Sequence, residues 1–147
     1  MAQLIQANLT HLAVLVPLFD QYRVFYKQKS DEEAAYIFLK NRLEKEEAII
    51  FLAYMNNEAV GFVQLYRTFS SVSLEPFFIL NDLYVMPSYR KKGVGEALLN
   101  EAKKVCLLKQ FKGLALETAA DNPAQQLYEK LGWKKQSNLF YFWDAPK

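Results

Sequence analysis

The segment from residue 76 to residue 105 joins a predicted β-strand to a predicted α-helix through a turn that contains Gly93 and Gly95. Two glycines let the backbone turn tightly and approach a ligand with no side chain in between. The helix after the turn offers unpaired N–H groups and the positive end of its dipole, which favour phosphate oxygens. Three cations immediately precede the glycines: Arg90, Lys91 and Lys92. The turn is therefore predicted to bind a phosphate or pyrophosphate group.

The same turn has a plainer interpretation as a surface turn that only caps a helix. Gly-x-Gly is a weak signal, and without further context this interpretation would be preferred. The segment Gly93-Val94-Gly95 also lacks the Lys-Ser/Thr ending of the Walker loop and the third glycine of the dinucleotide fingerprint. A protein that binds nucleotide phosphates through this turn is therefore strongly disfavoured.

The order of strand and helix signals along the chain, a meander of three strands flanked by strands that follow helices, indicates the α/β class. The patterns predict strands at residues 3–7, 48–54, 59–68, 76–85, 114–118 and 138–143, and helices at 11–26, 31–43, 93–111 and 123–131. No repeat or linker interrupts this order, so we expect a single domain over residues 1–147. Its central sheet is expected to be mixed, with about six to seven strands and about four flanking helices.

Two helix starts carry capping signals. Thr10 is the predicted N-cap of the first helix, and Pro17 is expected to kink that helix or to start a fresh turn. Ser30 and Glu33 have the spacing of a capping box, so Ser30 is the predicted N-cap of the second helix.

The composition excludes several kinds of site. His11 is the only histidine and Cys106 the only cysteine, so we expect no metal site, no disulfide framework and no Ser-His-Asp triad. The net charge is +2 without a long basic run, so no nucleic-acid partner is expected. The N-terminus does not resemble a signal peptide, and no apolar run reaches membrane-spanning length. We therefore expect a soluble, cytoplasmic protein with no membrane partner.

Asn81 and Asp82 are polar residues inside an otherwise apolar predicted strand. Successive strand residues face opposite sides of a sheet, so one of the two points into each layer. A carboxylate without partners is costly to bury. Asp82 is either a structurally paired acid or part of an acceptor pocket. The second interpretation is favoured, because the strand leads directly into the phosphate turn.

Two motifs resemble those of the GNAT superfamily of N-acetyltransferases. The run from Leu83 to Gly95 is similar to motif A, whose core is Arg/Gln-x-x-Gly-x-Gly/Ala. The run from Ala124 to Trp133 is similar to motif B, a helix with the pattern Leu-Tyr-Glu-Lys-Leu-Gly-aromatic. The predicted order of elements also resembles the superfamily's fold over nearly the whole chain. The segments 20–23, 69–72 and 79–83 are similar to a subgroup that includes small-amine, amino-acid and histone-type acetyltransferases.

The resemblance implies acetyl-CoA as the donor substrate and no metal. The backbone of Leu83, Tyr84 and Val85 would bind the pantetheine arm and the acetyl carbonyl, on a strand edge that is often splayed by a bulge. Tyr128 matches the tyrosine that commonly protonates the departing thiolate, although a lone helical tyrosine is otherwise a packing residue. The backbone that would wrap the pyrophosphate comprises Arg90, Lys91, Lys92, Gly93, Val94, Gly95 and Glu96.

The sequence departs from the superfamily at two positions. Motif B usually has an asparagine where this chain has Asp121, and Asn122 is one residue too close to the motif's alanine. Asn122 is still a candidate for contact with the cofactor if it caps the helix. Some amine acetyltransferases have a glutamate where this chain has Asn81. The base is therefore Asp82, Glu117 or an ordered water.

These residues imply direct transfer of the acetyl group to a primary amine in a ternary complex. The amine would lose a proton, through water, to Asp82, and Tyr128 would return a proton to sulfur. The acceptor is a small amine, an amino acid or a lysine-like group. The residues expected to bind it are Asp20, Tyr22, Tyr26, Glu75, Asn81 and Glu117.

The resemblance leaves one alternative open. A non-catalytic acyl-CoA sensor or interaction module would keep the phosphate turn and lack working acid and base groups. The presence of Asp82 and Tyr128 argues against it. A homodimer is expected only from the resemblance to the superfamily.

Overall fold

The computed structural model describes all residues, 1–147, in two units, Met1–Glu117 and Thr118–Lys147. The first unit contains a five-stranded sheet in the order β1-β2-β3-β4-β5, in which only β4 and β5 are parallel. The strands are β1 (Gln3–Gln6), β2 (Ala48–Met55), β3 (Glu58–Ser70), β4 (Glu75–Val85) and β5 (Leu114–Ala115). The α/β class and the mixed sheet are confirmed, with five strands where six to seven were expected.

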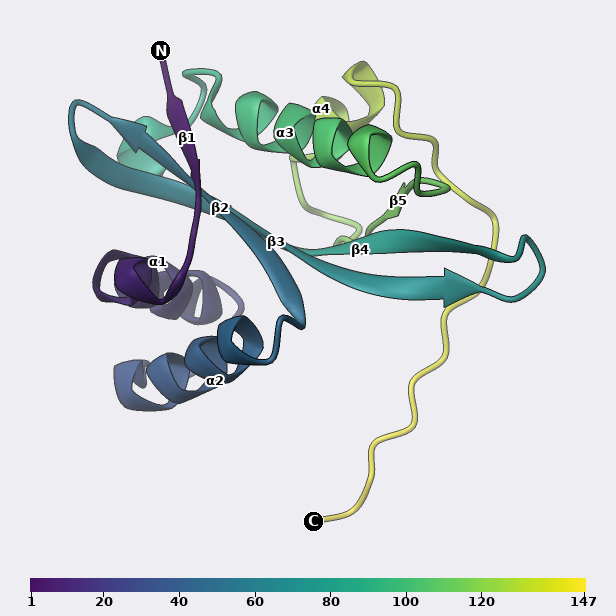
Figure 1. Cartoon of the computed structure of the whole chain (residues 1–147), viewed down its shortest axis with the longest axis horizontal. Coiled ribbons are helices and arrows are strands. Elements are labelled where there is room, and N and C mark those ends of the chain that lie inside the picture. The colour runs from purple at the N-terminus through teal and green to yellow at the C-terminus, as the bar shows by residue number, and fades with distance from the viewer. The chain divides into compact units, whose positions relative to one another are not determined.

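Helices cover both faces of this sheet (Figure 1). The first two, α1 (Leu12–Phe25) and α2 (Glu32–Glu44), lie on one face, and α3 (Val94–Leu108) lies on the other. Short 3-10 helices, η1 (Leu9–His11) and η2 (Pro87–Tyr89), lead into α1 and toward α3. In the second unit, α4 (Gln125–Lys130) is the only helix, which gives the expected total of four α-helices.

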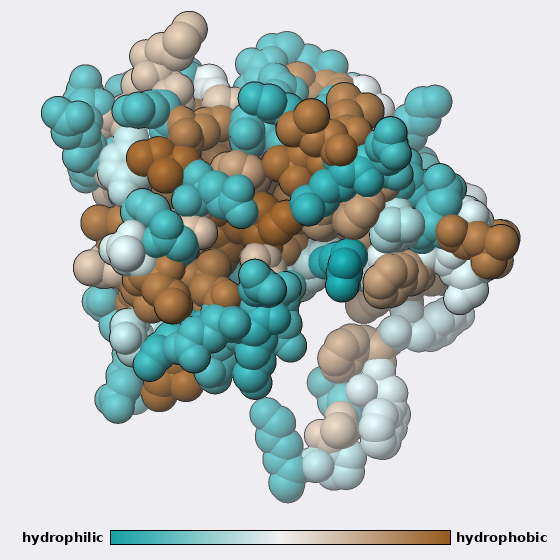
Figure 2. Space-filling model, viewed as in Figure 1, coloured by the Kyte–Doolittle hydropathy of each residue, from teal (hydrophilic) through white to brown (hydrophobic).

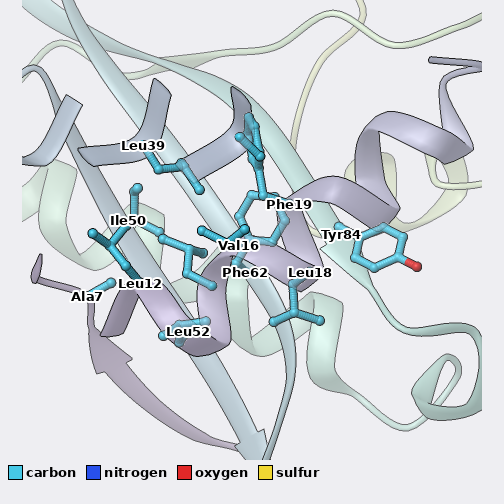
Figure 3. Close-up of a cluster of buried hydrophobic side chains, with 12 residues drawn as sticks. Ala7, Leu12, Val16, Leu18, Phe19, Leu39, Ile50, Leu52, Phe62 and Tyr84 are labelled. Atoms are coloured by element: carbon cyan, nitrogen blue, oxygen red, sulfur yellow. The ribbon is translucent and has the colours of Figure 1, made fainter. Parts of the chain in front are cut away.

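A large hydrophobic core lies where α1 and α2 pack on the sheet (Figure 3). Leu15, Leu39, Ile50, Leu52 and Phe62 are completely buried there. The apolar residues recur at helical spacing on α1 and at alternate positions on β2 and β3, so each element contributes one face. Burial of each large apolar side chain contributes about 1.5–3 kcal/mol. This core fixes the first two helices against the inner strands.

The predicted start of the first helix is wrong. Asn8, not Thr10, acts as the cap, because its Oδ1 accepts hydrogen bonds from the Thr10 backbone N–H (2.9 Å) and the Thr10 hydroxyl (2.6 Å). The α-helix then begins at Leu12 without a side-chain cap and runs through Pro17 as a single helix. Buried apolar residues on both sides of the proline favour this continuity, because packing stabilises a helix more than local propensity does.

The second helix also has a different cap from the predicted one. Asp31 is the N-cap, and its carboxylate accepts a hydrogen bond from the Ala34 N–H (3.0 Å). The Ser30 hydroxyl instead donates to Asp20 (2.6 Å). The capping-box prediction for Ser30 is therefore wrong by one residue.

Two predicted strands are shorter than expected or absent. Strand β5 has only two residues, Leu114 and Ala115, in place of residues 114–118. Residues 138–143 form no strand, although their aromatic pattern predicted one. A strand requires a partner for its backbone hydrogen bonds. Neither residues 116–118 nor residues 138–143 pair with another strand. This difference accounts for the lower strand count.

Gly61 on β3 lies against the backbone of β4. A Cβ atom at this position would be 2.7 Å from the carbonyl oxygen of Tyr84. Gly61→Ala is therefore expected to lower the free energy of unfolding by about 1–3 kcal/mol, measured by urea denaturation. Gly113→Ala is the control, because a Cβ there meets no atom within 4 Å. Equal stability of the two variants would contradict the expected close approach.

Candidate active site

A β-bulge interrupts β4 at Asn81. Gln64 of β3 pairs with Asp82, and Leu65 pairs with Leu80, so Asn81 is the extra residue without a partner. Adjacent residues of β3 face opposite sides of the sheet, and their partners share those sides. Leu80 and Asp82 therefore face opposite layers, although they are two residues apart in one strand.

The same bulge reverses the direction in which the backbone N–H and C=O groups of the strand point. The Phe78 N–H donates toward β5, to Gly113 O (3.0 Å), whereas the Met86 N–H donates to Val60 O of β3 (2.8 Å). In a regular strand, residues eight apart would point the same way, so one inserted residue accounts for the reversal. After the bulge, alternation turns the backbone of Leu83 away from β3. The backbone groups of Tyr84 face β3, and those of Val85 point outward again.

The outer edge of β4 is open over this stretch. Strand β5 pairs with β4 only at Phe78 and Ile79, so residues 80–85 have no partner strand on that side. The Val85 carbonyl oxygen accepts a hydrogen bond from Arg90 Nε (2.8 Å). The N–H groups of Leu83 and Val85 have no ladder partner and can donate to a ligand carbonyl or a developing oxyanion.

The predicted phosphate turn follows this edge and ends at α3. Gly93 has a φ of 84° and Lys91 a φ of 61°, both in the left-handed region. Gly93 is the N-cap of α3, no side chain caps the helix, and a Cβ at Gly93 would meet nothing within 4 Å. The helix therefore presents its first N–H groups beside open space, as the phosphate interpretation requires.

The three cations of the turn have different surroundings. Arg90 packs over the rings of Phe25 and Tyr84, at 5.5 Å and 5.6 Å from the ring centroids. Together with its hydrogen bond to β4, this contact holds the turn against the strand and α1. Lys91 and Lys92 are exposed and form no ion pair, so they are the two cations available to a phosphate.

Asp82 is buried on the α1 side of the sheet, with 5% of its surface exposed. Its Oδ2 accepts a hydrogen bond from Gln64 Nε2, and its Oδ1 accepts one from Asn81 Nδ2 (3.0 Å). Burial raises the pKa of Asp82 above its ordinary value of 3.8, and hydrogen bonds from Gln64, Tyr22 and Asn81 oppose that rise. A carboxylate in this setting suits a base, because it takes a proton more readily than an exposed one.

Two tyrosines lie beside the carboxylate. The Tyr22 hydroxyl donates to the Asn81 carbonyl oxygen (3.3 Å), and burial together with the charge of Asp82 raises the pKa of Tyr22 far above its usual value. The same two causes raise the pKa of Tyr66 to about 12. Both phenols therefore stay protonated at neutral pH and surround Asp82 with neutral groups.

Aromatic rings lead from this carboxylate toward the surface. Tyr22 packs edge-on against Tyr26 at 5.0 Å, and Tyr26 packs against Phe25 at 5.2 Å. Tyr26 is 43% exposed and Phe25 is 53% exposed, and apolar atoms are visible over the region of α1 in Figure 2. A protonated amine can approach along such rings by cation–π contact.

The structure does not bring all predicted acceptor residues together. Both oxygens of Asp20 hold the loop before α2, through the Ser30 hydroxyl (2.6 Å) and the Asp31 N–H (2.8 Å). Glu75 is seven residues from Asp82 along β4, roughly 20 Å away at the rise of a strand. Glu117 is exposed, two residues after the end of β5. Only Tyr22, Tyr26 and Asn81 of the predicted set lie around Asp82.

The second unit carries the predicted motif B. Tyr128 lies on α4, half-buried, with its ring 6.0 Å from that of Trp133. Asn122 Oδ1 accepts a hydrogen bond from the Ala124 N–H (2.9 Å), but the N-cap of α4 is Ala124 and no side chain caps the helix, so the predicted cap at Asn122 is wrong. Asp121 is exposed. The side-chain oxygen of Asn122 is therefore occupied by a local hydrogen bond, and the side-chain N–H groups are the part of Asn122 that can donate to a ligand.

Gln64 and Tyr66 were not predicted as site residues. Gln64 is completely buried in the apolar run of residues 59–65, where a polar side chain needs a partner. A polar residue inside an apolar run is the signal that marks Asp82, and it marks Gln64 equally. Tyr66 carries no such signal, because a tyrosine in a strand is common.

No group of three or more His, Cys, Asp or Glu side chains lies close enough together to hold a metal ion. No helix has both the length and the apolar character needed to cross a bilayer.

Residues 15–133 match the model of the acetyltransferase (GNAT) family. The chain is 45% identical over 138 residues to the uncharacterized N-acetyltransferase YhfO of Bacillus subtilis (strain 168), covering 93% of each chain. It also resembles the crystal structure of a probable acetyltransferase, with a TM-score of 0.92, 38% identity and 99% of each chain covered.

A more distant structure shares the fold. An aminoglycoside N-acetyltransferase solved in complex with CoA superimposes with a TM-score of 0.83 at 21% identity, covering 99% of this chain and 96% of that one. The open strand edge, the glycine turn at the start of α3 and the family match agree with one another. The chain therefore belongs to the acetyltransferase (GNAT) family and is an acetyl-CoA-dependent N-acetyltransferase.

Proposed function

We propose that this protein transfers the acetyl group to a primary amine by direct attack in a ternary complex, with Asp82 as the base. The observation that carries the proposal is the position of Asp82, a buried carboxylate of raised pKa directly before Leu83 and three residues before Val85. The proton acceptor and the backbone donors for the oxyanion thus come from one short stretch of β4. Such fixed donors stabilise charge as it develops at the carbonyl.

The donor substrate is held by the backbone of this chain. The N–H groups of Leu83 and Val85 bind along the pantetheine arm and at the acetyl carbonyl. The turn from Arg90 to Glu96 binds the pyrophosphate, with Lys91 and Lys92 adding charge. Asn122 and Tyr128 complete the set by their match to motif B.

Tyr128 returns a proton to the sulfur when the thiolate leaves. A phenol of pKa about 10 is a suitable donor to a thiolate whose acid has a pKa of about 8.5, once both are desolvated. The support for this role is the position of Tyr128 in the Leu-Tyr-Glu-Lys-Leu-Gly-Trp pattern.

The acceptor reaches Asp82 along the rings of Tyr22 and Tyr26. A water between the amine and Asp82 relays the proton, because the carboxylate is only 5% exposed. Small amines, amino acids and lysine-like groups fit this route. Aminoglycosides belong in the same test, because an aminoglycoside N-acetyltransferase shares the fold.

We also infer that residues 1–147 act as one domain in the cytoplasm. The support is that the family match, residues 15–133, extends across both structural units. A homodimer is a further expectation of the family resemblance, and sedimentation of the purified protein would test it.

The proposal is tested by incubating the purified protein with acetyl-CoA and a panel of amines while free thiol is measured over time. The panel comprises a monoamine, a polyamine, several amino acids, an aminoglycoside, and peptides with a free N-terminus or a lysine. Acetylated product, identified by mass spectrometry together with equal thiol release, is the expected result. Thiol release that is independent of every amine, or no release with any of them, would count against amine transfer.

A further inference from the structure

Gln64 has one side-chain atom that nothing in the protein satisfies. The residue is completely buried on β3, its Nε2 donates to Asp82, and its Oε1 has no hydrogen-bond partner. A buried amide oxygen without a donor is unfavourable, and such groups in a native protein usually have a role. The role must lie at Asp82, because that carboxylate is the residue opposite Gln64 in the strand register.

The carboxylate is held by an amide from each of two strands. Gln64 of β3 donates to Oδ2, and Asn81 of β4 donates to Oδ1 (3.0 Å). These bonds suit the charged form of Asp82. Once Asp82 has taken a proton, its O–H becomes a donor and needs an acceptor in the same place.

A carboxamide can meet both demands. Rotation of the amide plane by half a turn exchanges N–H donor and oxygen acceptor without moving the rest of the side chain. We propose that Gln64 is a positioning residue for the base: its N–H donates to the charged carboxylate before the reaction, and its Oε1 accepts a hydrogen bond from the O–H of protonated Asp82 afterward. The inference rests on the proposed function, in which Asp82 is the base.

The proton balance is simple. The N–H bond of the amine breaks, its proton passes through the relay water, and an O–H bond forms at Asp82. No oxidant, reductant or further reactant is needed. Release of that proton to solvent after the product leaves restores the charged carboxylate and the original amide orientation.

The groups that face Asp82 from neighbouring elements are neutral. Tyr22 approaches from α1, Tyr66 and Gln64 from β3, and Asn81 is on β4 itself. Tyr26 lies behind Tyr22, and the charges of Arg42 and Glu47 act on Tyr66. Among these groups, only Gln64 combines a bond to Asp82 with a buried, unpaired acceptor.

The test is to titrate Asp82 directly in the free protein, by NMR of carbon-13 at the aspartate carboxyls. The Asp82 signal is assigned by its loss in Asp82→Asn. In Gln64→Met, which keeps the size of the side chain and removes both amide atoms, the Asp82 midpoint is expected to rise by roughly one pH unit. The variant loses both the bond to the charged carboxylate and the weaker bond from the protonated one, so the difference between the two sets the shift. The midpoint at which kcat/KM falls at low pH should move by the same amount.

A second variant keeps the test decisive if the methionine side chain disturbs the fold. Gln64→Glu retains the shape and places a second carboxylate beside Asp82, so the two groups are expected to titrate in two widely separated steps. Leu65→Met is the control, because it changes a buried neighbour on the opposite face of β3. It should leave the Asp82 midpoint where it is in the natural protein.

An unchanged midpoint in folded Gln64→Met and Gln64→Glu would overturn the inference. So would a loss of kcat/KM that is equal at every pH, since a purely structural role predicts that result. The carboxyl titration needs no activity. If no amine is acetylated, the proposed function fails while the titration still decides the role of Gln64.

Discussion

Asp82→Asn is expected to lower kcat/KM for the amine by about 10²–10⁴-fold near pH 7, the usual contribution of a positioned base. The variant keeps the size of the side chain and one of its two acceptor oxygens, but it cannot take the proton. Initial rates of thiol release across pH would measure the effect. In the natural enzyme, kcat/KM should fall at low pH as Asp82 becomes protonated, with a midpoint above pH 3.8 because the pKa of Asp82 is raised. The Asp82→Asn variant should not show this fall.

The same substitution is expected to stabilise the fold at neutral pH. Below pH 3.8, Asp82 is protonated in both the folded and the unfolded chain. As the pH rises, the unfolded chain releases this proton first, because the folded pKa is raised. Stability is therefore lost with increasing pH until the pH passes the folded pKa. Asp82→Asn has no such loss, and the new amide N–H can donate to the unpaired Gln64 Oε1.

Two measurements would contradict this role of Asp82. One is a rate for Asp82→Asn within tenfold of the natural enzyme, which would move the base to another residue or to water alone. The other is a lower free energy of unfolding for the variant at pH 8, which would make Asp82 a structural acid. Asp144→Asn, an exposed aspartate outside every helix and strand, is the matched control and should change neither quantity.

Tyr128→Phe is expected to lower kcat by about 10²-fold or more, while the dissociation constant for acetyl-CoA changes little. The hydroxyl acts only as the thiolate leaves, so its loss affects the transition state and leaves the ground state nearly unchanged. Steady-state rates together with calorimetric titration of acetyl-CoA would separate the two effects.

The control for this prediction is Tyr141→Phe, which removes an exposed hydroxyl from the same unit. It should leave both constants unchanged. Unchanged turnover in Tyr128→Phe would show that solvent protonates the sulfur. An equal loss of turnover and of acetyl-CoA affinity would instead indicate that Tyr128 only binds the donor.

Local signals were sufficient for the parts of the fold that depend on neighbouring residues. Apolar spacing, Pro87 and the two glycines predicted β4 and the start of α3 within one residue, and the end of α3 within three. The helix caps were missed by one or two residues, because adjacent polar side chains compete for the same backbone groups. Asn8 is a better acceptor than Thr10, and Ser30 is drawn to Asp20.

The features that were not predicted depend on residues far apart in the sequence. The bulge at Asn81 becomes visible only once β4 is aligned with β3, and the pair of Gln64 and Asp82 exists only in that register. The aromatic segment 138–143 has strand propensity, yet propensity alone provides no partner. Position in space, not in sequence, also separates the predicted acceptor residues. Tyr22 of α1 and Tyr26, which directly follows α1, lie near Asp82, while Glu75 shares β4 with Asp82 but lies at its other end.

The extra residue at Asn81 also limits how β4 can change during evolution. Loss of Asn81 alone would leave Asp82 directly after Leu80 and still opposite Gln64, so the carboxylate would stay on the α1 side. If Asn81 instead paired with Gln64 in a regular ladder, Asp82 would face α3 and the Leu83 N–H would face β3. A substitution that let Asn81 enter the ladder would therefore displace the base and the oxyanion donors in one step, whereas deletion of Asn81 would not.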